Sequence, residues 1–211
     1  KPLYSILSYQ WAGLDNLGNP QGFVDKEPSS DYTKIFNNLT SPDSLIFNGQ
    51  SIPKYFGSFG NEISWKKLSF EILLSYSLGY YFRKPATSYS QLFNSGIAYT
   101  DIVNRWKQPG DENNTNVPSL PYPANVNRDN FYLGSTATVE KADNIRVQFV
   151  NLRYDFTRKG GFLKSFATLK LFINASNLGI LWKATDSEFD PDFPAIIRPN
   201  RTWIVGVKAN F

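Results

Sequence analysis

The chain has 211 residues, a formal net charge of +4 and an aromatic content of 16%. It contains no Cys, His or Met, which excludes disulfides, thiolate nucleophiles, zinc knuckles and every catalytic arrangement that needs an imidazole from this chain. The mild charge comes without a basic run, which argues against nucleic acid as a partner. The sequence starts at Lys1 without a signal peptide, so we expect a piece of a longer protein.

Residues 1–57 are rich in turn-forming residues, and two short helices are predicted within them. Ser30 is placed to cap a helix over 31–37, and Ser41 is placed to cap a second helix that ends before Gly49. We interpret the whole segment as mostly loop.

The segment 58–83 predicts a hairpin of two strands. Residues 58–65 alternate between apolar and polar, and Lys66-Lys67 predicts a tight turn. Residues 68–83 then place eight apolar side chains on one phase without a break, which chance alone would give roughly once in a thousand. This predicts a long strand, whereas strands of globular proteins usually have about five or six residues. The eight residues are Leu68, Phe70, Ile72, Leu74, Tyr76, Leu78, Tyr80 and Phe82.

The rest of the chain alternates between long irregular segments and strands. Residues 84–141 are polar and irregular, and a segment of this length is usually functional or covers something. A strand follows over 142–156, with a break in phase near Phe149 that predicts a β-bulge. A turn over 157–167, a strand over 168–182, a loop over 183–201 and a closing strand over 202–211 complete an all-β chain.

Alternation alone is typical both of a soluble β-sandwich and of a transmembrane β-barrel, since in each case one phase is apolar. Three features favour the barrel. The strands are long, short and long connections alternate, and aromatic residues such as Tyr76, Tyr80 and Trp203 occur toward strand ends. On this interpretation the apolar phase faces lipid, and we assign Phe70, Ile72, Leu74, Tyr76 and Leu78 to it.

Several motifs, in this order, resemble the C-terminal part of the SusC/RagA family of TonB-dependent outer-membrane transporters of Bacteroidetes. The similarity covers essentially the whole chain. The motifs are Tyr9-Gln10-Trp11-Ala12-Gly13-Leu14-Asp15, Pro53-Lys54-Tyr55-Phe56-Gly57-Ser58-Phe59-Gly60-Asn61, Arg105-Trp106-Lys107-Gln108-Pro109-Gly110-Asp111, Ala142-Asp143-Asn144-Ile145-Arg146 leading into Asn151-Leu152-Arg153-Tyr154, Asn174-Ala175-Ser176-Asn177-Leu178-Gly179, and the final strand from Arg201-Thr202-Trp203 to Phe211.

The resemblance implies a 22-stranded antiparallel barrel with an N-terminal plug, in the bacterial outer membrane. It implies a SusD-like surface lipoprotein and TonB as partners, and oligosaccharides or peptides as substrates. This chain would be about the last fifth of such a transporter, without the plug and the TonB box. The segments 1–57, 84–141 and 183–201 would be outer loops. The closing strand would be the signal for membrane assembly, through Trp203, Val205, Val207, Ala209 and Phe211.

No catalytic residue and no cofactor are expected, because a pore moves its substrate without covalent chemistry. The alternating acids Asp186, Glu188, Asp190 and Asp192 suggest a Ca²⁺ site, but they lack the spacing of an EF-hand, and solvated loop acids are the preferred interpretation.

Four aromatic residues of the segment 84–141 are candidates for contact with a substrate or a partner, with packing inside the segment as the alternative. They are Trp106, Tyr122, Phe131 and Tyr132. A secreted, soluble β-sandwich that binds glycans remains the alternative for the whole chain.

Overall fold

The structure is a computed structural model that describes residues 2–39, 41–156, 168–194 and 197–210. The chain divides into two compact units, each assembled from two separate stretches of sequence. We call Pro53–Tyr80 with Ala142–Phe211 the sheet unit, and Lys1–Ile52 with Tyr81–Lys141 the α/β unit.

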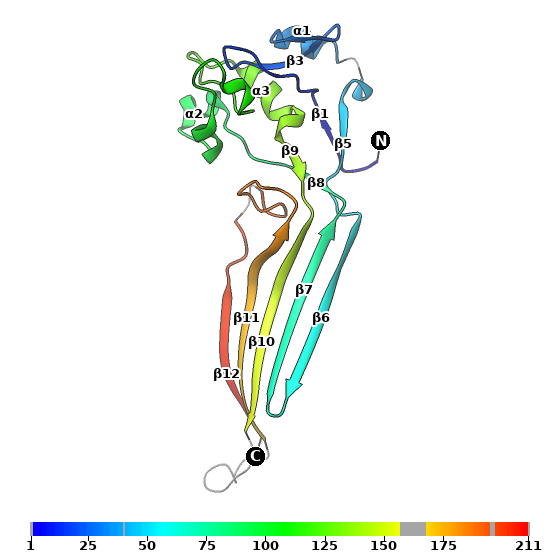
Figure 1. Ribbon diagram of the computed structural model, residues 1–211, viewed down its shortest axis with the longest axis vertical. Coiled ribbons are helices and arrows are strands. Elements are labelled where there is room, and N and C mark those ends of the chain that lie inside the picture. The colour runs from blue at the N-terminus through cyan, green and yellow to red at the C-terminus, as the bar shows by residue number, and fades with distance from the viewer. Residues whose placement is uncertain (1, 40, 157–167, 195–196, 211) are drawn as a thin grey trace. The chain divides into compact units, whose positions relative to one another are not determined.

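The sheet unit is built on a five-stranded antiparallel sheet in the order β12-β11-β10-β7-β6, which can be followed in Figure 1. Each of the five strands predicted from the sequence is present, and Lys66 forms the predicted turn between β6 and β7 with a positive φ. The predicted turn over 157–167 lies outside the described residues. The strands are β6 Tyr55–Trp65, β7 Leu68–Leu78, β10 Asn144–Phe156, β11 Thr168–Lys183 and β12 Thr202–Asn210.

The strand register gathers the apolar phase of all five strands on one face of the sheet. Leu74 of β7 lies opposite Phe59 of β6 and Val147 of β10. Across the rest of the sheet, Ile173 of β11 lies opposite Val205 of β12. Large apolar side chains are exposed along this face, among them Phe59, Ile63, Trp65, Trp203, Val205 and Val207.

The opposite face carries a polar network. The amide of Asn151 donates to the carboxylate of Glu71 at 3.3 Å, and Lys170 lies 3.3 Å from Asp155. Polar side chains on one face and apolar ones on the other are the arrangement that the alternating sequence predicts.

The predicted bulge near Phe149 is confirmed. The register of β10 shifts between Val147 and Phe149 against both β7 and β11, which leaves Gln148 without a partner in either ladder. Because one extra residue moves the following side chains to the other face, the bulge keeps Val147 and Val150 on the same apolar face. This explains why the alternation in the sequence breaks there.

The α/β unit contains three small antiparallel sheets, β1–β5, β2–β3–β4 and β8–β9. Its first stretch holds β1 Ser5–Ser8, β2 Gly13–Leu14, β3 Pro20–Val24, β4 Glu27–Ser29, α1 Tyr32–Asn37, the 3₁₀ helix Pro42–Ser44 and β5 Ile46–Gln50. Its second stretch holds β8 Tyr81–Arg83, α2 Tyr89–Ser95, the 3₁₀ helices Thr100–Asn104 and Asp111–Asn113, α3 Val126–Gly134, the 3₁₀ helix Thr136–Thr138 and β9 Val139–Lys141.

An aromatic core holds the two stretches of the α/β unit together. Phe131 of α3 is fully buried against Tyr32 and Ile35 of α1, and the ring of Tyr9 stacks on it at 5.7 Å between centroids. Burying side chains of this size stabilises a unit by roughly 2–3 kcal/mol each. The segments 1–57 and 84–141 therefore contain a folded core of their own.

Two arginines, the half-buried Arg83 and the buried Arg128, add polar links within this core. The guanidinium of Arg83 donates to the carbonyls of Leu133 and Ser135 at 2.8 and 2.9 Å and to the hydroxyl of Ser8 at 2.7 Å. Arg128 of α3 donates to the carbonyl of Gly18 at 2.9 Å. Burial is the main influence on both guanidinium groups and lowers the pKa of Arg83 and of Arg128.

Three details of the sequence prediction are corrected. The strand predicted over 68–83 ends at Leu78, because Gly79 takes a positive φ and its N–H donates to the carboxylate of Asp143 at 2.6 Å. The first helix is capped by Asp31 rather than Ser30. The second predicted helix is a single 3₁₀ turn that is followed by β5, so Gly49 lies in a strand instead of just past a helix.

Candidate ligand-binding site

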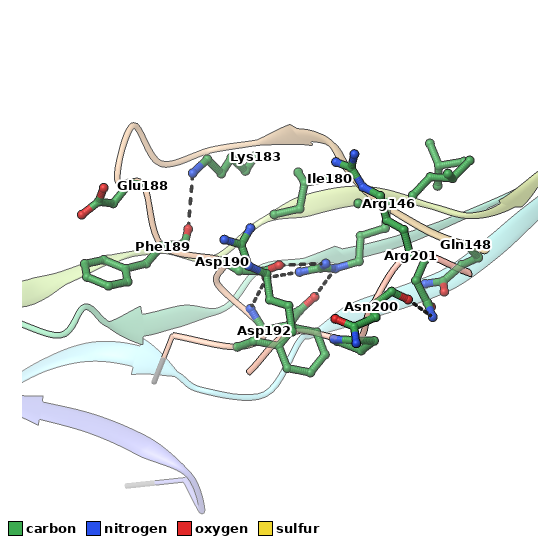
Figure 2. A pocket seen from close by; sticks show the side chains of 17 residues that line it. Arg146, Gln148, Ile180, Lys183, Glu188, Phe189, Asp190, Asp192, Asn200 and Arg201 are labelled. Carbon is green, nitrogen blue, oxygen red and sulfur yellow. Dashed lines mark hydrogen bonds and ion pairs between the residues drawn. The ribbon is translucent and has the colours of Figure 1, made fainter. Parts of the chain in front are cut away.

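The sheet unit contains a cavity of about 860 Å³, formed where β10 begins and β11 ends. Described residues of the loop between β11 and β12 border it (Figure 2). Its lining is mostly polar and charged, with the three segments contributing Arg146, Val147 and Gln148 from β10, Asn177 to Ile180 and Lys183 from β11, and Glu188 to Asp190, Asp192, Phe193 and Arg198 to Arg201 from the loop.

The wall of the cavity is shaped by irregular strand pairing. In β11, Asn177 and Gly179 both take positive φ, and the ladder to β10 skips from Ser176 to Gly179. Asn and Gly are the residues that adopt this conformation most readily. The segment Asn174 to Gly179 therefore interrupts the regular pairing of a long strand next to the loop.

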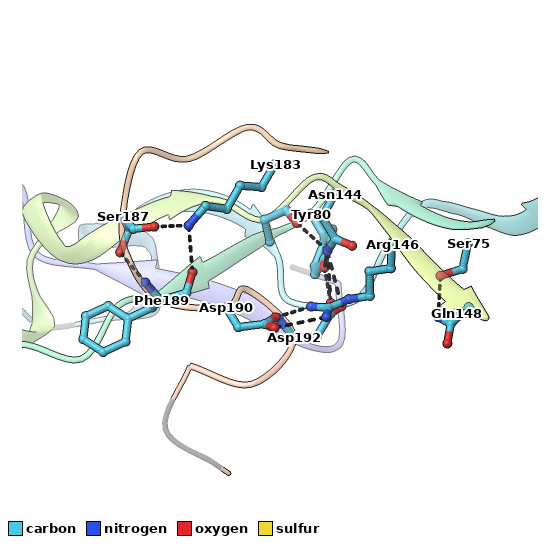
Figure 3. Close-up of polar contacts among 11 residues, drawn as sticks. Ser75, Tyr80, Asn144, Arg146, Gln148, Lys183, Ser187, Phe189, Asp190 and Asp192 are labelled. Atoms are coloured by element: carbon cyan, nitrogen blue, oxygen red, sulfur yellow. Dashed lines mark hydrogen bonds and ion pairs between the residues drawn. The ribbon is translucent and has the colours of Figure 1, made fainter. Parts of the chain in front are cut away.

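Arg146 anchors the loop to the sheet. Its Nε donates to the Asp192 carboxylate at 2.5 Å, and its Nη1 donates to Asp190 at 3.0 Å, while Nη2 donates to the second oxygen of Asp190 (Figure 3). The Phe193 ring lies 5.4 Å from the guanidinium. Only 2% of the Asp190 side chain and 14% of the Arg146 side chain are exposed, so this ion pair is shielded from solvent.

Two more residues complete the anchor. Tyr80 follows the end of β7, and Asn144 is the first residue of β10. The Tyr80 hydroxyl donates to Asp192, and the Asn144 amide donates to the Tyr80 oxygen at 2.8 Å. Burial, reinforced by the hydrogen bond to the Asp192 carboxylate, raises the pKa of Tyr80 well above its usual range. Tyr80 therefore stays protonated and donates its hydroxyl hydrogen to Asp192.

The remaining cations of the cavity have no carboxylate partner among the described residues. Lys183 donates to the backbone carbonyls of Ser187 and Phe189, the latter at 3.3 Å. Arg198 and Arg201 are exposed and line the cavity. The arrangement offers hydrogen-bond donors and positive charge to a ligand, and it suits recognition and orientation of that ligand.

Sequence reasoning did not single out these four cations as site residues. Arg146 and Arg201 occur in segments that carry the family resemblance. Lys183 is the last residue before the acid-rich loop, and Arg198 lies inside that loop. Opposite charges within and next to that loop were the available signal, but pairing Arg146 with acids more than 40 residues away requires the fold.

The prediction of solvated loop acids is correct for Asp186 and Glu188, which are exposed, and wrong for Asp190 and Asp192, which pair with Arg146. Among the described residues, no group of His, Cys, Asp and Glu is placed to hold a metal ion.

The structure separates the four aromatic candidates of the segment 84–141. Phe131 and Tyr132 are buried, and the indole of Trp106 donates to the carboxylate of Glu112 at 3.0 Å. Tyr122 is 87% exposed and packs edge-on against Phe93, which leaves it the most accessible of the four.

The strand register places the described residues that were predicted to face lipid or to direct assembly on one face of the sheet. Phe70, Ile72, Leu74, Tyr76 and Leu78 share the apolar face of the sheet, and so do Trp203, Val205, Val207 and Ala209 of the edge strand β12. Phe211 lies outside the described residues. Their roles in the membrane remain predictions. None of the described helices combines the length and hydropathy needed to cross a bilayer.

No family model and no curated protein matches the sequence. Solved structures of an importer do match the fold. The chain superposes on the RagAB peptide transporter with a TM-score of 0.67, 20% identity and 98% of its own length. It also matches the RagAB peptide importer in its "open-open" and "closed-closed" states, each with a TM-score of 0.65, 20% identity and 97% of the chain.

The resemblance predicted from the sequence motifs is thus confirmed at the level of fold, over nearly the whole chain. The chain spans 22–23% of the length of the matched chains. Its antiparallel sheets share the fold of the matching part of the RagAB structures.

Proposed function

We propose that this chain is the C-terminal barrel segment of a TonB-dependent importer in the bacterial outer membrane, and that the cargo is peptide. The observation that carries this proposal is the five-stranded sheet with one apolar and one polar face, in a fold that matches part of a peptide importer. Between the two substrates that the family resemblance implies, the match to a peptide importer favours peptides over oligosaccharides.

The apolar face suits contact with lipid. The hairpin strands β6 and β7 each have 11 residues. At about 3.4 Å per residue and a tilt of about 40°, such a strand rises roughly 28 Å, enough to cross an apolar band of about 25 Å. The lipid-facing residues are then those assigned from the sequence, Phe70, Ile72, Leu74, Tyr76 and Leu78, and the polar face with Glu71 and Asn151 lines the lumen.

The two edges of the sheet support incorporation into a larger barrel. β6 and β12 are the edge strands, and unpaired edges of this length are avoided in native proteins. About eight strands are needed to close the smallest barrels, so the remaining strands of a 22-stranded barrel would pair with β6 and β12. β12 would also be the assembly signal.

Partners follow from the same proposal. A SusD-like surface lipoprotein would contact the α/β unit from outside, with the exposed pair Tyr122 and Phe93 as a candidate contact. TonB would act through the plug of the complete transporter, and no step of the transport requires a catalytic residue from this chain.

The alternative, a soluble glycan-binding sandwich, is disfavoured by the sheet unit. A sandwich needs a second sheet against its apolar face, whereas in this unit Phe59, Trp65 and Val205 are exposed, and its described residues form no second sheet.

The test is fractionation and uptake with the complete gene product. We expect the protein in the outer membrane, and uptake of labelled peptides that stops when the proton gradient is collapsed or the gene is deleted. Labelled oligosaccharides are the matched control. Recovery as a soluble protein without detergent would overturn the barrel, and energised uptake of oligosaccharides alone would overturn the choice of cargo.

A further inference from the structure

We propose that the cavity beside β10 and β11 is a carboxylate-binding subsite in which Arg198 and Arg201 hold an anionic group of the peptide cargo. The inference rests on the proposed function for the nature of the cargo. It assigns chemistry to a site that the fold resemblance does not describe.

The first step of the argument is the distribution of charge. Four cations and three carboxylates line the cavity. Asp190 and Asp192 are both committed to Arg146 through shielded ion pairs. What faces the cavity beyond this anchor is an excess of positive charge, from Lys183, Arg198 and Arg201 against Glu188.

The second step is the absence of competing partners. Among the described residues, neither Arg198 nor Arg201 makes an ion pair, whereas Arg146 and Arg153 each do. A guanidinium presents several N–H donors in a fixed plane and pairs with a carboxylate through two parallel hydrogen bonds. Two unpaired guanidinium groups beside one cavity therefore favour an anionic ligand.

The third step is that the loop is held in place around the cavity. Lys183 of β11 donates to the carbonyl of Ser187 in the first turn of the loop, and Arg146 of β10 holds the carboxylate of Asp192 in the middle of the loop (Figure 3). The Asn177 amide of β11 donates to the carbonyl of Asn200 near the end of the loop at 3.2 Å. Arg201 follows Asn200 directly, so this hydrogen bond fixes the backbone from which the Arg201 side chain extends. Preorganisation of this kind lowers the cost of binding.

The size of the cavity fits a peptide fragment. Its volume of about 860 Å³ lies within the usual range of about 300–1,000 Å³ for sites that enclose small organic ligands. A peptide can offer its C-terminal carboxylate or the side chain of Asp or Glu, and both have the same chemistry toward arginine.

The experiment measures the binding of defined peptides to the complete transporter, purified in detergent. An acidic peptide with a free C-terminus is compared with its C-terminal amide and with its Asn/Gln counterpart. The double variant Arg198→Gln/Arg201→Gln is compared with Lys141→Gln, which removes an exposed cation from β9, outside the cavity. Heat modifiability of the barrel checks assembly, and the two single arginine variants are used if the double variant fails to assemble.

We expect the double variant to bind the acidic peptide roughly 10- to 100-fold more weakly, as the loss of charged hydrogen bonds predicts, and with a smaller dependence on salt. Lys141→Gln should bind like the unchanged protein. Weaker binding of the amide identifies the terminal carboxylate as the ligand, and weaker binding of the Asn/Gln peptide identifies the side chains. Equal binding by the double variant and the unchanged protein would overturn the subsite but leave peptide import intact. An unchanged protein that binds none of the peptides would overturn both.

Discussion

Replacing Arg146 by Gln tests whether the anchor between the loop and the sheet is as strong as its burial indicates. The substitution leaves Asp190, with a side chain only 2% exposed, next to Asp192 without a cation. Removing one partner of a buried ion pair costs about 3–5 kcal/mol, because the remaining charge stays desolvated. The many ladder hydrogen bonds of the five-stranded sheet do not depend on this contact, so the loss should appear as local opening of the loop.

Hydrogen exchange of the loop measures this opening directly. At about 1.4 kcal/mol per tenfold change, the expected loss raises exchange of the amides of Asp192 and Phe193 roughly a hundredfold to several thousandfold in the complete transporter. The N–H groups of both residues donate to Asp190 in the closed loop, at 3.1 and 3.0 Å.

Arg153→Gln is the matched control, because Arg153 lies on the same strand and pairs with Glu62, but the two side chains are 38% and 48% exposed. Exposed pairs contribute about 0–1 kcal/mol, so this variant should change exchange by less than about fivefold. A second variant, Arg146→Gln/Asp190→Asn, removes one of the stranded charges and should recover part of the protection. Equal exchange in the Arg146 and Arg153 variants would refute the reasoning.

Three further predictions concern the sheet and the α/β unit. Leu74→Arg, on the apolar face, should reduce the yield of heat-modifiable barrel far more than Ser75→Arg on the polar face, because arginine at mid-membrane costs about 2–4 kcal/mol; equal yields would mean that the faces are reversed. Gly206→Ala should destabilise the protein by about 1–3 kcal/mol in denaturant titrations, because the new Cβ would lie 2.5 Å from the ring of Phe172. Gly60→Ala serves as the control, because its nearest neighbour would be the end of the Leu73 side chain at 3.3 Å. Burial raises the pKa of Tyr89 to about 12, so its phenol stays mostly neutral in the folded protein below that pH, while the unfolded chain ionises above about pH 10. This contribution to stability is complete below pH 10 and should fall by about 2 kcal/mol by pH 12, measured by tyrosinate absorbance with Tyr89→Phe as control.

The strands could be predicted because their signal is local. Each strand of the sheet unit shows its two faces in its own sequence, and even the bulge at Phe149 appears as a local break in phase. The point where β7 ends was not predicted, because Tyr80 and Phe82 continue the apolar phase beyond Gly79. They do so because both are buried, Phe82 in a strand of the other unit.

The α/β unit was predicted least well, since its core depends on contacts between distant segments. Phe131 packs on Tyr32 across about half the length of the chain, and Arg128 donates to the carbonyl of Gly18 across 110 residues. Helices of six to nine residues give only a weak periodic signal. The same residues, taken in sequence, are typical of a long polar loop, and only the assembled core distinguishes the two.

The candidate site combines both situations. Its position could be inferred, because a loop that connects two neighbouring antiparallel strands lies at the end of the sheet. Its chemistry could not, because Asp190 and Asp192 were equally compatible with solvated acids until Arg146 was found between them. That pairing reverses the charge that the site presents to a ligand, from negative to positive. With these two acids committed to the anchor, the loop that is acid-rich in sequence faces its cavity with arginine, and an anionic cargo becomes the ligand that the cavity fits.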